Sequence, residues 1–401
     1  MTRLRTCRLA FMFLLCVAAG IPASAQNTFF TTLFSFSQTD GSNTNATLVL
    51  GTDGNLYGAT FGGGAYGLGT IFKTTIAGSL TTLYNFCSQP NCPDGSDPSG
   101  LVEANDGNFY GATFGGGTSS NCGRYGCGTV FKITPSGELT TLHSFDGADG
   151  AAPWAGLMQA SSGNFYGTTE LGGTNGAGTV FQITPAGAIS MLYSFCSQPN
   201  CTDGGQPTAP LMQATDGNLY GTTAGLGTTS GTVFKITMSG ILTTLYNFCS
   251  QPNCTDGAQP QGGLVQADDG NFYGTTFRGG LGNYGTVFKI TPEGVLITLH
   301  DFNGSDGYNP FAGLAQARDG NFYGTTSAGG TANDGTVFKI TPEGVLTTLH
   351  NFERSDGYWP YAGLVQASNG AFFGATSIGG PNGWGTIFRL GLVHTCATCR
   401  P

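Results

Sequence analysis

The sequence predicts an all-β protein, a seven-bladed β-propeller with four antiparallel strands per blade, closed by an N-terminal strand that completes the last blade. Three observations lead to this prediction. A phrase of the type "GNFYGTT" occurs seven times, each period holds four short apolar runs, and the two ends of the chain carry complementary parts of one period. Four strands in a period of about 40–50 residues are typical of a propeller blade.

The repeated phrase sets the period. It begins at Gly54, Gly107, Gly163, Gly217, Gly270, Gly320 and Gly370, in steps of 53, 56, 54, 53, 50 and 50 residues. A single four-stranded sheet cannot bury both of its faces, whereas a ring of similar sheets lets each blade cover the next. We therefore expect the phrase to serve the architecture of the protein.

The four strands of a period follow one another in a fixed order, which we name A to D. In one period they are "GLVQA" (263–267), "NFYGTT" (271–276), "GTVFKIT" (285–291) and "ITLHDF" (297–302). Asp-Gly at 269–270 joins A to B, and "TPEG" at 291–294 joins C to D. Both connections are tight-turn signals, so antiparallel hairpins are expected.

The ends of the repeat region test the ring independently. The chain carries "FFTTLFSF" at 29–36, a D strand with no A, B or C before it. It reaches "GTIFRL" at 385–390, a C strand with no D after it. The first strand is therefore expected to complete the seventh blade, which removes open sheet edges.

Residues 1–25 are interpreted as a secretory signal peptide. Three arginines precede the apolar run "LAFMFLLCVAAGI", and "ASA" ends at Ala25. The expected domains are this leader, a propeller over 26–390 and a short tail over 391–401. We expect a monomer secreted to the periplasm or the extracellular space, with no membrane insertion after cleavage.

Charge narrows the choice of partner. The 14 basic and 23 acidic residues become 11 and 23 once Arg3, Arg5 and Arg8 are removed, so the net charge changes from −9 to −12. Such a field repels nucleic acid. A glycan or an extracellular protein is the expected partner.

Strand order predicts that the variable loops share one face. The A–B and C–D turns are short and uniform, whereas the D–A and B–C loops vary in length and hold cysteines and extra aromatics. Because these two loop types lie at the same end of each blade, distinctive chemistry is expected around one mouth of the central channel.

Each D–A loop contains Asp-Gly, and three of these aspartates, Asp149, Asp306 and Asp356, precede loops rich in aromatics. One interpretation is a ring of carboxylates that binds a ligand or a cation such as Ca²⁺. The other, which we favour, is an aspartate bonded to its own turn. No cofactor is otherwise predicted.

Aromatic side chains in the D–A loops are the candidate ligand contacts. Trp154, Phe311 and Tyr361 directly follow a proline, whereas Ser99, Thr208 and Gln261 take that place in other periods; Tyr308 and Trp359 precede the proline. Exposed, such rings would stack on sugars. Packing within the loops is the alternative.

Cysteines occur in close pairs, which predicts local disulfides in an exported protein. The predicted pairs are Cys87–Cys92, Cys122–Cys127, Cys196–Cys201, Cys249–Cys254 and Cys396–Cys399. The C-x-x-C spacing of the last pair also occurs in metal sites. No second C-x-x-C is present to complete such a site.

Catalytic patterns are not found in the sequence. His143, His300 and His350 occupy a strand D position that holds Phe or Tyr in other periods, so we interpret it as a site for ring packing. G-x-S-x-G, H-E-x-x-H and P-loop motifs do not occur. Glu103 and Glu170 are irregular acids with no readable pairing.

The set "DGNFYGTT…GG…GTVFKITPEG…TTLHNF" resembles the GloVer tandem-repeat family of exported bacterial proteins over nearly all of residues 29–390. The resemblance implies the fold and export but no activity. Members often end in sorting or anchoring tails, whereas this sequence ends "HTCATCRP". We expect a non-catalytic binder of a glycan or exported protein. The alternatives are a polysaccharide hydrolase or lyase and a cell-envelope scaffold.

Overall fold

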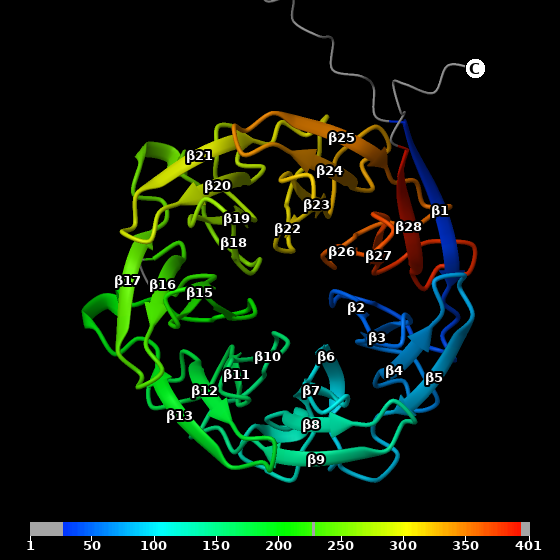
Figure 1. The fold of residues 1–401 in the computed structure, drawn as a ribbon. Helices are drawn as coiled ribbons and strands as arrows, with labels where there is room; N and C mark the ends of the chain where they lie inside the picture. Colours follow the sequence, from blue (N-terminus) through cyan, green and yellow to red (C-terminus); the bar gives the residue numbers. More distant parts are fainter. Residues whose placement is uncertain (1–26, 227–228, 394–401) are drawn as a thin grey trace, which may run out of the picture.

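The computed structural model describes residues 27–226 and 229–393 of the 401-residue chain. Its strands form seven separate four-stranded antiparallel sheets arranged as a ring about a central axis (Figure 1). The predicted seven-bladed propeller is therefore confirmed. The expected leader (1–25) and the cysteines of the tail (Cys396 and Cys399) lie outside the described residues.

The blades are numbered along the chain, and each runs from the channel outward. Blade 1 consists of β2 (Val49–Leu50), β3 (Leu56–Thr60), β4 (Thr70–Thr74) and β5 (Leu80–Asn85); blade 2 of β6 (Ser96–Glu103), β7 (Phe109–Gly115), β8 (Thr129–Ile133) and β9 (Leu139–Ser144); blade 3 of β10 (Met158–Gln159), β11 (Phe165–Thr169), β12 (Thr179–Ile183) and β13 (Ile189–Ser194); blade 4 of β14 (Met212–Gln213), β15 (Leu219–Thr223), β16 (Thr232–Ile236) and β17 (Leu242–Asn247).

The remaining blades follow the same plan. Blade 5 consists of β18 (Val265–Gln266), β19 (Phe272–Thr276), β20 (Thr286–Ile290) and β21 (Leu296–Asp301); blade 6 of β22 (Ala315–Gln316), β23 (Phe322–Thr326), β24 (Thr336–Ile340) and β25 (Leu346–Asn351); blade 7 of β26 (Val365–Gln366), β27 (Phe372–Thr376), β28 (Thr386–Val393) and β1 (Asn27–Ser35). Three short 3₁₀ helices lie in loops: η1 (Gly123–Tyr125), η2 (Pro199–Cys201) and η3 (Pro252–Cys254).

The ring closes where the sequence predicted. Strand β1 pairs antiparallel with β28, with Thr31 opposite Arg389 and Phe30 opposite Leu390. The ring of Phe30 also stacks on His350 of blade 6 at 3.7 Å. Strand β28 continues to Val393, three residues past the expected end of the propeller, because residues 391–393 pair with residues 27–29.

The repeated phrase packs neighbouring blades together. Tyr273 of blade 5 stacks on Phe322 of blade 6 at 4.1 Å, and the equivalent Tyr–Phe pairs join four other neighbouring blades. The glycine between the aromatic and the threonines makes room for a strand C ring: a Cβ on Gly274 would lie 2.6 Å from Phe288. The phrase therefore supplies the core between blades, as expected.

The threonines of the phrase are also structural. The last one, on strand B, exchanges hydrogen bonds with the first threonine of strand C in every blade, as between Thr276 and Thr286 at 2.9 Å. Both hydroxyls are buried and satisfied. The preceding threonine reaches the next blade: Thr275 Oγ1 donates to the Ala312 carbonyl, which belongs to the channel mouth.

Candidate functional site

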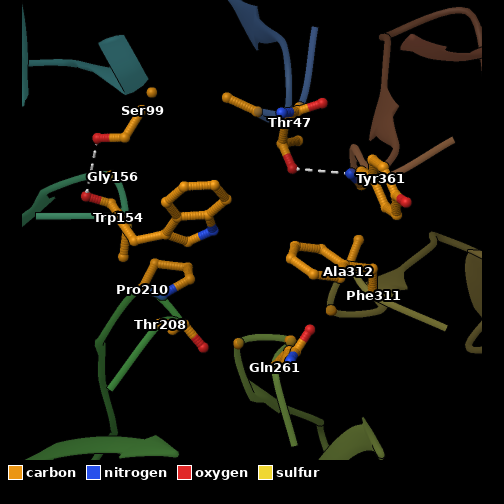
Figure 2. A pocket seen from close by; sticks show the side chains of 18 of the residues that line it. Thr47, Ser99, Trp154, Gly156, Thr208, Pro210, Gln261, Phe311, Ala312 and Tyr361 are labelled. Atoms are coloured by element: carbon orange, nitrogen blue, oxygen red, sulfur yellow. Dashed lines mark hydrogen bonds between the residues drawn. The ribbon is translucent and has the colours of Figure 1, made fainter. Parts of the chain in front are cut away.

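The variable loops do share one face. In five blades the D–A loop and the B–C loop are joined by an antiparallel bridge, as between Tyr308 and Ala328 in blade 6. The D–A loops then lead into the inner strands, so their last residues surround the channel. The site built from these residues is drawn in Figure 2.

A cavity of about 290 Å³ lies at this end of the channel and is lined by all seven blades. One residue from each blade forms what we call the mouth ring: it follows the proline of the D–A loop, or Thr44 in blade 1, where no proline is present. The mouth ring is Asn45, Ser99, Trp154, Thr208, Gln261, Phe311 and Tyr361. All seven are half-buried.

The backbone before the mouth ring is fixed by the neighbouring blade. Asn309 adopts a left-handed conformation with φ of 56°, and its N–H donates to the Tyr284 carbonyl of blade 5 at 2.8 Å. Pro310 then packs on Gly285, where a Cβ would lie only 2.8 Å from the proline Cδ. The equivalent residues in every blade have positive φ: Asn43, Asp97, Ala152, Gln206, Gln259, Asn309 and Trp359.

Four mouth-ring residues are polar and uncharged. Asn45 Oδ1, Thr208 Oγ1 and Gln261 Oε1 are buried and have no hydrogen-bond partner among the described residues. Buried polar atoms are usually paired, so such atoms at a cavity indicate sites for a ligand or ordered water. Ser99 differs, because its hydroxyl donates to the carbonyls of Ala112 and Ala155.

The other three mouth-ring residues are aromatic and come from two sides. Phe311 and Tyr361 meet edge to face at 5.0 Å on blades 6 and 7. Trp154 comes from blade 3 and faces them across the cavity (Figure 2). Burial raises the pKa of Tyr361, so its phenol stays protonated over the neutral range.

Two aromatic residues that sequence reasoning missed support Trp154. Phe61 and Phe114 lie 5.4 and 5.3 Å from its ring. Each directly follows the last threonine of strand B, at a position that the sequence analysis did not consider. Their occurrence in neighbouring blades, at the position held by Glu170 in blade 3, was the available signal.

The two aromatics expected before the proline lie outside the cavity lining. Tyr308 packs on Tyr284 at 5.4 Å. Trp359 is 41 % exposed and lies 6.1 Å from Tyr361. The structure thus brings Trp154, Phe311 and Tyr361 together at the mouth and leaves Tyr308 and Trp359 on the loops around it.

The three candidate aspartates are held within their own loops. Asp149 accepts hydrogen bonds from His143 Nε2 at 2.6 Å and from the Asp146 N–H. Asp306 and Asp356 are bonded in the same way to His300 and His350. None of the three lines the mouth cavity, and this geometry matches the turn interpretation.

The histidine position in strand D therefore does more than pack a ring. Tyr84, Tyr193 and Tyr246 donate their hydroxyls to the loop aspartates of blades 1, 3 and 4, just as the histidines contact theirs. Where strand D carries Phe34, the Ser37 hydroxyl donates to Asp40 instead. The position selects rings with a polar tip that anchors the loop.

Four of the five predicted local disulfides are present, and the fifth, Cys396–Cys399, lies outside the described residues. Cys87–Cys92, Cys122–Cys127, Cys196–Cys201 and Cys249–Cys254 are bonded. Within the described ranges no helix is long and apolar enough to cross a membrane. No group of three or more His, Cys, Asp or Glu side chains able to hold a metal ion occurs there either.

Among the described residues, the Tyr361 phenol is the one ionisable side chain that lines the mouth cavity. Its lining, in the part of the chain that the structure describes, contains no Asp, Glu, His, Lys, Arg or Cys. Burial raises the pKa of Glu170, but this residue does not line the cavity. The mouth can therefore offer stacking surfaces and neutral hydrogen-bonding groups to a ligand.

Comparison with a family model decides the relationship of the chain. The model of the Gloeobacter/Verrucomicrobia repeat matches residues 22–123, 117–318 and 229–399. The chain belongs to the Gloeobacter/Verrucomicrobia repeat family. This confirms the resemblance seen in the repeated phrases. No curated protein shows a significant match to this member of the family.

Solved structures similar to this repeat protein share its fold at low sequence identity. A putative 6-phosphogluconolactonase from Bacteroides fragilis has a TM-score of 0.52 and 21% identity, over 81% of this chain and 88% of that one. A second putative 6-phosphogluconolactonase, from Bacteroides uniformis, has a TM-score of 0.51 and 16% identity, over 76% of this chain and 84% of that one. A puromycin-hydrolyzing peptidase from Mycobacterium tuberculosis has a TM-score of 0.56 and 11% identity, over 89% of this chain and 53% of that one.

Proposed function

We propose that this protein is an exported, non-catalytic propeller whose mouth ring binds an uncharged carbohydrate. The observation that carries the proposal is the composition of the ring, in which three aromatic side chains lie beside four polar ones, and three of the polar ones have buried oxygens without partners among the described residues. Sugars suit such a site because their C–H faces stack on aromatic rings and their hydroxyls donate to amide and hydroxyl oxygens.

Size and charge narrow the ligand further. A cavity of about 290 Å³ is at the small end of the range of roughly 300–1,000 Å³ for small-molecule sites. It suits one or two sugar rings, so the end of a glycan is the proposed ligand. Because the lining has no charged side chain, neutral sugars are favoured over uronic acids, whose carboxylates would lose water without gaining a partner.

Export is part of the proposal. It is supported by the leader-like sequence of residues 1–25 and by four local disulfides, which persist in oxidising compartments. An extracellular protein partner and a cell-envelope scaffold are the alternative roles. Neither explains why unpaired polar atoms point into a small cavity.

A glycan array with neutral and acidic oligosaccharides tests the proposal. Trp154→Ala and Gln261→Ala should each weaken binding of neutral glycans about tenfold or more, since each removes a stacking surface or a hydrogen-bonding group. Trp384→Ala is the matched control, because Trp384 is 39% exposed and lies outside the cavity lining. Equal losses in all three variants, or no glycan bound at all, would overturn the assignment.

The enzyme alternative is tested on the same material. Hydrolysis of a glycosidic bond normally needs a pair of carboxylic acids about 5–10 Å apart at the scissile bond, and the mouth cavity has none. Release of reducing ends or unsaturated products from a polysaccharide panel, lost in Trp154→Ala, would contradict a purely binding role.

A further inference from the structure

A second cavity lies between the loops of blades 1 and 2 and shares no lining residue with the mouth cavity. Its volume is about 570 Å³, within the range of small-molecule sites. Two disulfide-closed loops contribute walls: the first provides Pro90 to Cys92, and the second provides Gly123 to Gly126. Blade 2 is the only described blade whose B–C loop contains a disulfide.

One carboxylate, that of Asp97, lines this cavity without forming an ion pair among the described residues. Asp97 is half-buried, and its side chain accepts a hydrogen bond from Ser96 Oγ at 3.0 Å. Among the described residues no Lys, Arg or His forms an ion pair with it, although Arg124 lines the same cavity. Five aspartates of the A–B turns, by contrast, each pair with a lysine: Asp53, Asp106, Asp216, Asp269 and Asp319. Burial raises the pKa of the Asp97 carboxyl.

Apart from Asp97 and Arg124, the lining is uncharged and rich in hydroxyl groups. Thr118, Ser119 and Ser120 follow one wall, and the exposed ring of Tyr125 lies at the edge with the Arg124 guanidinium stacked on it. A ligand that fits must offer a cation to the carboxylate and polar groups to the hydroxyls.

We propose that this cavity, which we call the blade 2 pocket, binds an amino sugar, with the ligand's ammonium group paired to Asp97 and its hydroxyls bonded to the Thr118–Ser120 segment. The pocket is independent of the mouth ring. If the blade 2 pocket bound no amino sugar, the proposal of a neutral glycan site at the mouth ring would still stand. If the mouth ring bound no glycan, the proposal for the blade 2 pocket would still stand.

Calorimetric titration with glucosamine, N-acetylglucosamine, glucose and lysine tests the proposal. Glucosamine should bind most tightly. Acetylation removes the charge, glucose lacks the amine, and lysine lacks the ring hydroxyls, so each should bind about tenfold or more weakly. Lysine binding as tightly as glucosamine would overturn the sugar part, and equal binding of glucose would overturn the role of charge.

Asp97→Asn is the decisive variant. Blades 1 and 6 carry Asn43 and Asn309 at the same left-handed position, with φ of 57° and 56°, so asparagine fits this backbone. The variant should fold as the wild type does and lose the preference for glucosamine over glucose. Trp154→Ala should keep that preference. Unchanged glucosamine binding in Asp97→Asn, or its loss in Trp154→Ala, would refute the site, as would no glucosamine binding at millimolar concentration.

Discussion

Replacing Gly313 with alanine should destabilise the propeller, whereas the same replacement at Gly156 should not. Both glycines lie three residues after the D–A proline and line the mouth cavity. Neither has a positive φ. An added Cβ at Gly313 would lie 2.4 Å from the Gly263 carbonyl oxygen of blade 5, but at Gly156 the nearest atom would be 3.9 Å away, on Gly100.

The expected difference follows from these distances. At Gly156 the methyl meets ordinary contact distances, so the smaller conformational entropy of the unfolded chain should stabilise the protein by about 0.4–1 kcal/mol. At Gly313 the methyl collides with backbone, and a backbone shift of this kind costs about 1–3 kcal/mol. The two variants should therefore differ in free energy of unfolding by roughly 1.5–4 kcal/mol.

Guanidinium unfolding followed by circular dichroism measures this difference. The midpoint of Gly156→Ala should equal or exceed that of the wild type, and that of Gly313→Ala should fall. The reasoning depends on direct backbone contact between neighbouring blades at the mouth. If both variants shifted the midpoint by the same amount and in the same direction, that contact would not control the stability of the ring.

Three further outcomes are expected. Phe30→Ala should cost about 3 kcal/mol, because it removes the stacking of β1 on His350; an unchanged melting temperature would argue against ring closure by β1. Although burial raises the pKa of Asp269, the hydrogen bond from Lys289 and those from Asn271 and Tyr273 outweigh it and hold that pKa well below its usual range. Its stabilisation should be complete above about pH 4 and decline at lower pH, and Asp269→Asn should make urea unfolding less acid-sensitive. EDTA should leave the melting temperature unchanged, whereas a fall would support the alternative that the D–A loop aspartates bind a cation such as Ca²⁺.

The fold could be predicted because the same strand pattern recurs in every period of the sequence. Each period gives the same strand order, and the unpaired D strand at 29–36 indicates where the ring closes. The face that carries the variable loops followed from strand order alone. The spacing from the proline also grouped Trp154, Phe311 and Tyr361, and all three line the mouth cavity because one backbone geometry places that residue in every blade.

The chemical state of individual atoms could not be predicted. Thr208 and Gln261 were seen in the sequence only as places where an aromatic is missing, since the burial of one oxygen depends on packing from neighbouring blades. Asp97 was likewise hidden, because the carboxylate enters a cavity made by a loop more than 20 residues further along the chain. Sequence periodicity reports what blades share, whereas these groups differ from blade to blade.

Pairing of β1 with β28 imposes an order on folding. The first strand of the propeller finds its partner only after about 350 further residues have been made, so β1 has no strand partner while the inner blades form. The four disulfides span five residues each and can close within their own blades long before that. In a chain that ends before β28, strands β1 and β27 would both keep unpaired edges that can pair with other chains. Premature termination should therefore yield aggregates in place of a smaller propeller.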